Sequence, residues 1–63
     1  MKWLVQWYVN TVFNGSYKGA KDIETGTIEE AIQKCQERVV NEDMIGWNPA
    51  RIKILNVSIY KEN

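Results

Sequence analysis

KWLVQWYVNTVF, residues 2–13, is the stretch that decides the fold of this chain. Large apolar side chains recur in it with a period of two, which is the period of a β-strand with one buried face. They are Trp3, Val5, Trp7, Val9 and Phe13. Two of the three Trp and the only Phe of the chain belong to this set. Because aromatic side chains dominate burial in so small a core, we expect this strand at the centre of the sheet.

The opposite face of the same strand has a mixed character. It carries Leu4, Gln6, Tyr8, Asn10 and Val12. This set is too apolar for an ordinary solvated face and too polar for a second core. We therefore expect this face to contact a binding partner.

Composition limits the classes of protein to consider. A chain of 63 residues forms one domain, residues 1–63, and has little stability to spare. One Cys and no His exclude an intramolecular disulfide and a zinc knuckle. Equal numbers of basic and acidic residues remove the usual electrostatic signature of a nucleic-acid binder. Gln6 interrupts the first apolar run, so we expect no signal peptide or membrane helix and a cytoplasmic location.

Asn-Gly at residues 14–15 predicts a β-hairpin whose second strand reaches about Thr25. A two-residue turn would direct Ile23 away from the core. A three-residue loop with Gly15 in the left-handed region places Ile23 beside Val5 instead.

The three-residue loop also sets Gly19 beside Val9. We favour this register, or an equivalent bulge near Gly19. The second strand is otherwise rich in charged residues, which is typical of an edge strand.

A helix start follows the hairpin. Thr27 as N-cap with Glu30 three residues later forms a capping box. The apolar stripe of the helix comprises Ile28, Ala31, Ile32, Cys35 and Val39. We expect the helix to end between Val40 and Asp43, because acidic residues there oppose the helix dipole and Gly and Pro follow.

The segment at residues 44–49 is a connecting loop rich in apolar residues, part of which we expect to fold under the helix end. A last strand runs from Arg51 to Lys61, but its apolar pattern changes phase. Either a bulge near Leu55 restores the phase, or Leu55, Val57 and Ile59 face the helix while Ile52, Ile54 and Tyr60 face outward. We favour the second arrangement.

Together these elements predict an α+β fold of ββαβ order. A right-handed crossover places the last strand beside the first, which gives a three-stranded antiparallel sheet of order 2-1-3 with one helix on one face.

Chemistry-bearing residues are few. Cys35 lies in the apolar stripe without a His to activate it, so we interpret it as an inert core thiol. The spacing of Glu29, Glu30, Glu42 and Asp43 matches no calcium loop. No Gly-rich phosphate loop is present, and no strand face offers the two buried carboxylates that an acid–base pair would need. We therefore predict no catalytic residue, no metal, no cofactor and no enzymatic activity.

The lysines and arginines concentrate on the strands and the acids on the helix, so we expect a basic sheet and an acidic helix. We predict a protein-binding face on the bare side of the sheet, formed by Leu4, Tyr8, Val12, Lys53 and Tyr60. An alternative is that the same basic, Tyr-bearing sheet binds single-stranded nucleic acid. A third use is homodimerisation through this face or through the edge of the last strand.

In layout the chain resembles the small proteins that lytic phages make early in infection. The resemblance rests on a Trp-rich first strand, a short hairpin, the capped helix start ETGTIEEAI at residues 24–32 and a closing strand. It is closest to short inhibitors of host RNA polymerase and to anti-CRISPR or anti-restriction proteins. It implies a non-catalytic inhibitor or adaptor that covers a surface of a host protein in the bacterial cytoplasm. Such proteins often carry a strong net charge, and this chain carries none.

Overall fold

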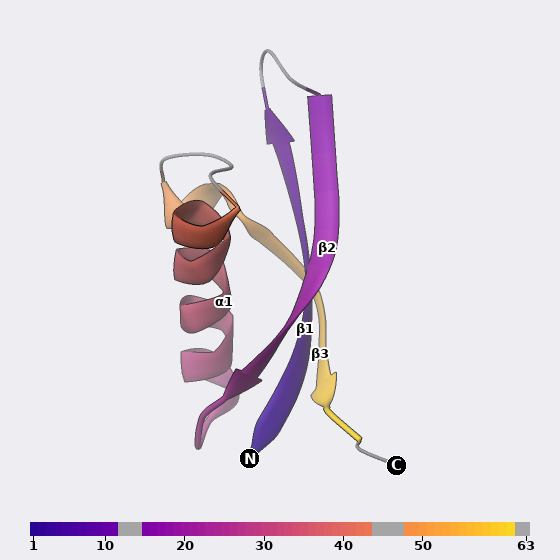
Figure 1. Ribbon diagram of the computed structural model, residues 1–63, viewed down its shortest axis with the longest axis vertical. Coiled ribbons are helices and arrows are strands. Elements are labelled where there is room, and N and C mark those ends of the chain that lie inside the picture. Colours follow the sequence, from indigo (N-terminus) through magenta and orange to yellow (C-terminus); the bar gives the residue numbers. More distant parts are fainter. Residues whose placement is uncertain (12–14, 44–47, 62–63) are drawn as a thin grey trace.

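A computed structural model describes residues 1–11, 15–43 and 48–61. Three antiparallel strands form one sheet of order β2-β1-β3, and the helix α1 packs on one face of it (Figure 1). The elements are β1 (Lys2–Thr11), β2 (Gly15–Glu24), α1 (Ile28–Glu42), the short 3-10 helix η1 (Pro49–Arg51) and β3 (Lys53–Ile59). This is the predicted ββαβ fold. The predictions for Val12, Phe13 and the loop residues 44–47 lie outside the described residues.

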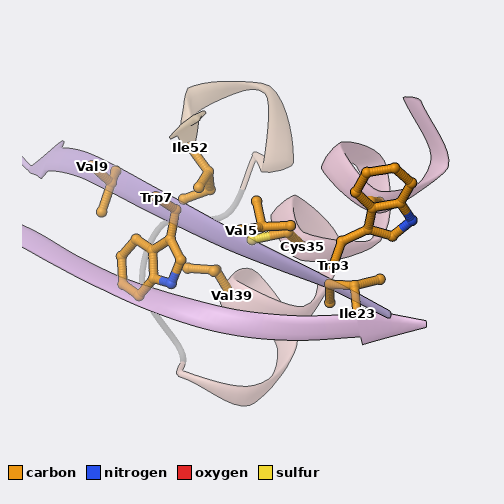
Figure 2. Packing of buried hydrophobic residues seen from close by; sticks show 9 residues of the cluster. Trp3, Val5, Trp7, Val9, Ile23, Cys35, Val39 and Ile52 are labelled. Carbon is orange, nitrogen blue, oxygen red and sulfur yellow. The ribbon is translucent and has the colours of Figure 1, made fainter. Parts of the chain in front are cut away.

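The core lies between the helix and one face of the sheet, as Figure 2 shows. The alternation in β1 is confirmed as far as Val9, because each of its odd-numbered apolar side chains is buried. The buried apolar residues are Trp3, Val5, Trp7, Val9, Ile23, Ala31, Cys35, Val39 and Ile52. The first strand is therefore the centre of both the sheet and the core.

The register of the β1–β2 hairpin differs from the predicted one by two residues. Odd residues pair with odd residues and Gly15 has a φ of 80°, both as expected. However, Ile23 lies opposite Trp3, not Val5, and Gly19 lies opposite Trp7. A Cβ atom at Gly19 would lie 2.9 Å from Cζ2 of the Trp7 ring. The indole thus requires a neighbour without a side chain, and this requirement accounts for the register.

Thr25 connects the first strand to the helix start. Its backbone N–H donates to Met1 O and its carbonyl accepts from Trp3 Nε1, at 3.0 and 3.2 Å. Its hydroxyl donates to Thr27 O at 2.8 Å. Since Thr25 is buried, these bonds satisfy its polar groups where water does not reach.

The helix begins and ends where the sequence predicts. Thr27 caps it by accepting a hydrogen bond from the Glu30 backbone N–H at 3.2 Å, and the last helical residue is Glu42. The predicted apolar stripe is wrong at Ile28, whose side chain is 45% exposed. The helix enters the core through Ala31, Cys35 and Val39, and Ile28 lies beyond the end of that cluster.

The preferred arrangement of the last strand is wrong, and the alternative with a bulge is correct. Ile54 pairs with Trp7 and Asn56 with Gln6, so Leu55 is the extra residue of a β-bulge. The bulge restores the phase: Ile52 is buried and both Ile54 and Val57 pack against the core. Of the three residues expected to face the helix, Val57 does so, Ile59 lies on the helix side of the sheet but is 56% exposed, and Leu55 is 60% exposed.

The strand also begins later than expected. The Asn48 side chain accepts from the Ala50 backbone N–H at 3.0 Å, and Pro49 supplies the fixed φ of a first helical residue. Residues 49–51 consequently form η1, and Arg51, which we expected in the strand, lies in this turn.

Candidate binding surface

The side of the sheet away from the helix is bare in the part of the chain that the structure describes (Figure 1). We call it the open face. Side chains alternate along a strand, so the open face takes the even-numbered residues of β1 and, through the pairing, those of β2. On β3 it takes Lys53, Asn56 and Ser58, which pair with even-numbered residues of β1.

Four of the five predicted partner-binding residues share this face. Tyr8 pairs directly with Lys53, and Leu4 pairs with Ser58. Tyr60 continues the ladder, because its backbone N–H donates to Lys2 O at 2.9 Å. The fifth residue, Val12, lies outside the described residues.

Tyr8 has a lysine on each side. Lys18 of β2 and Lys53 of β3 are its two cross-strand neighbours, and both are exposed. The Tyr8 hydroxyl lies 3.2 Å from Ser16 Oγ, which donates to Asn10 Oδ1 at 3.1 Å. These bonds restrain the Tyr8 ring between the two lysine side chains. This end of the open face is an aromatic platform with a positive field around it.

The other end of the open face is electrically mixed. Lys2 Nζ lies 5.0 Å from the centre of the Tyr60 ring, within the range of a cation–π contact. Lys2 Nζ also lies 4.0 Å from Asp22 Oδ2, and Glu24 is the cross-strand neighbour of Lys2. Acidic side chains on this face therefore gather away from Tyr8.

The predicted contrast between a basic sheet and an acidic helix is only partly realised. Lys21 lies opposite Val5, on the helix side of the sheet. Its ammonium lies 3.5 Å from a Glu42 oxygen and 3.2 Å from an Asp43 oxygen. The ion pairs of Lys21 thus connect β2 to the helix end, and its ammonium is not part of the open face.

The apolar content of the open face is lower than expected. Ile52 and Ile54, expected outside, belong to the core or pack against it. Leu4 and Tyr8 are each half-buried among polar neighbours. The face therefore suits a polar or charged partner surface better than a large apolar one.

Cys35 is fully buried in the helix stripe. Burial raises the pKa of its thiol to about 11, and the nearby Lys21 and Arg38 offset only part of this effect. A thiol with so high a pKa holds little reactive thiolate near neutral pH. The residue packs the core and offers no nucleophile.

The described residues show neither a metal-binding cluster nor a membrane-spanning helix. They contain no group of three or more His, Cys, Asp or Glu side chains placed to hold a metal ion. They also form no helix with the length and apolar character needed to cross a membrane. Comparison of the chain with protein-family models, curated proteins and solved structures gives no match.

Proposed function

We propose that this protein is a non-catalytic binding module that covers an acidic surface of another protein with its open face. The observation that carries the proposal is the placement of Tyr8 between Lys18 and Lys53 on the bare side of the sheet. Tyr combines a large apolar ring with a polar end, and it is enriched in binding hot spots. Two flanking cations favour a partner that presents carboxylates.

The proposal agrees with the resemblance to small phage inhibitors, which act in the host cytoplasm by covering a functional surface of a host enzyme. A host protein is then the partner. We infer the class of partner from the resemblance and the acidic character of its surface from the residues of the open face.

The test is retention of a partner from bacterial lysate on immobilised protein, with variants that change one property of the face. Tyr8→Ala removes the ring, and a double variant, Lys18→Glu with Lys53→Glu, reverses the field around it. Lys34→Glu is the matched control, because Lys34 is exposed on the helix. We expect wild type and Lys34→Glu to retain the same protein and both open-face variants to lose it. Equal retention by all four would contradict the proposal.

Single-stranded nucleic acid is the second candidate partner, and the same observation supports it. An aromatic ring with lysines on both sides provides base stacking and phosphate contacts together. Affinity for a fluorescent oligothymidylate, followed by anisotropy against salt concentration, separates the two functions. If Lys2, Lys18 and Lys53 each neutralised a phosphate, log K would fall with a slope of about −2 against log salt. Weak binding that does not change with salt excludes this function.

A further inference from the structure

The two outer edges of the sheet are protected very differently. Along β2, Lys18 and Lys21 are charged, and Arg38 Nη1 donates to the Asp22 carbonyl at 3.1 Å. A side chain of the helix thus occupies an outward backbone group of this edge. Charge and occupied backbone groups are the usual means by which an edge strand avoids pairing.

Within residues 1–11, 15–43 and 48–61, the edge of β3 lacks such protection over most of its length. Seven uncharged residues, 54–60, separate Lys53 from Lys61. Leu55 and Ile59 on this strand are both more than half exposed. An uncharged edge with exposed apolar side chains is a template for pairing with another strand.

The hydrogen-bond phase identifies the outward backbone groups. Tyr60 N donates to Lys2 O, so the backbone of Tyr60 faces β1. Backbone direction alternates along a strand, so the N–H and C=O groups of Val57 and Ile59 face outward. The bulge at Leu55 ends this regular stretch on the other side.

We infer that β3 pairs with β3 of a second copy of this chain, antiparallel and with a two-fold axis at Ser58. In this register Val57 lies opposite Ile59 of the second copy, and Ile59 lies opposite Val57. The two apolar pairs form on the helix side of the sheet, where these residues pair with Val5 and Trp3 in their own chain. Ser58 meets Ser58 on the open face.

Charge supports a second copy as the occupant. No charged side chain occurs between residues 54 and 60, so the pairing opposes no like charges. The chain as a whole has a formal net charge of zero, so two copies do not repel each other. The register with Val57 opposite Val57 is less favourable, because it would set Ile59 against the bulged Leu55.

The dimer has one sheet of six strands, in which the two open faces are continuous. The inference does not depend on what the open face binds. A two-fold contact through β3 leaves Tyr8, Lys18 and Lys53 outside the paired stretch, 56–60.

Ser58 is the position at which to test the pairing, because a charge there meets its own copy. Sedimentation equilibrium of the wild type should show a species of twice 7.4 kDa that increases with protein concentration. Ser58→Lys and Ser58→Asp should each raise the dimer dissociation constant about tenfold or more, since like charges oppose each other at the axis. An equimolar mixture of the two variants should recover the dimer, because opposite charges then meet.

A cross-link tests the register independently of charge. Two Cys at a non-hydrogen-bonded antiparallel pair lie within disulfide distance. Ser58→Cys should therefore form a disulfide-linked dimer under mild oxidation. Ala20→Cys, on the open face of the protected β2 edge, is the matched control and should not. A wild type that stays monomeric at high concentration overturns the inference. So does a dimer that persists in both charged variants, or one that Ser58→Cys cannot cross-link.

Discussion

At the scale of single residues, the contact between Trp7 and Gly19 sets the register of the hairpin. The indole ring lies against the Gly19 backbone, where no side chain fits. Its Nε1 is buried and meets no acceptor among the described residues. The ring therefore stabilises the fold through packing and apolar burial, and close packing makes such a site sensitive to one added methyl group.

Gly19→Ala tests this contact. The added Cβ would lie 2.9 Å from the Trp7 ring, so the ring or the strand must move. We expect a loss of about 1 to 3 kcal/mol in the free energy of unfolding, measured by urea denaturation. Gly26→Ala is the control, because nothing lies within 4 Å of a Cβ at Gly26, and it should be neutral or slightly stabilising. Equal stability of the two variants would contradict the role of Gly19.

At the scale of elements, side chains of α1 hold it to both edges of the sheet. Arg38 donates to the Asp22 carbonyl on β2, and Gln36 Nε2 donates to the Ile52 carbonyl before β3 at 2.9 Å. The helix end itself carries Glu42 and Asp43, which oppose the dipole, and its last turn has no basic residue. Lys21 from the sheet supplies the compensating charge.

Glu42→Gln should make the protein less sensitive to acid. Hydrogen bonding to Arg38 lowers the pKa of Glu42, assisted by the charges of Arg38 and Lys21. A carboxyl whose pKa is lower in the folded state stabilises the fold fully above its unfolded pKa, about 4.3. That contribution is lost as pH falls through the folded pKa.

Thermal melts between pH 7 and pH 3 measure this effect. The melting temperature of the wild type should fall further over this range than that of Glu42→Gln. Glu29→Gln is the control, because the structure gives that exposed carboxylate no ion pair among the described residues. Parallel pH profiles for wild type and Glu42→Gln would show that the Arg38–Glu42 contact contributes no stability.

Local sequence signals predicted the elements better than they predicted register. The capping box at Thr27 and Glu30 is a local interaction, so the helix start could be found from the sequence. The register of the hairpin depends on how Trp7 packs against Gly19. The bulge at Leu55 depends on which side chains of the last strand pack against the core. Both are tertiary effects that a period-two pattern does not contain.

At the scale of the whole molecule, the two faces of the sheet have different roles: one supports the fold and the other is available for binding. One face of β1 carries the core and the other carries the open face, so neighbouring residues have different roles. The placement of Leu4, Tyr8 and Tyr60 on one face followed from parity in the sequence, whereas Lys53 joins them only because the bulge at Leu55 shifts the phase of β3. That Lys18 and Lys53 flank Tyr8, and that Lys21 is used elsewhere, could be found only once the register was known.

Thermal melts of Trp7→Ala and Tyr8→Ala, followed by circular dichroism, test this separation most directly. Trp7→Ala should lose about 3 to 5 kcal/mol, which is comparable to the whole stability of so small a domain, and should be unfolded. Tyr8→Ala, one residue along the same strand, should lose about 1 kcal/mol or less and melt cooperatively. A folded Trp7→Ala together with an unfolded Tyr8→Ala would contradict the assignment of the two faces.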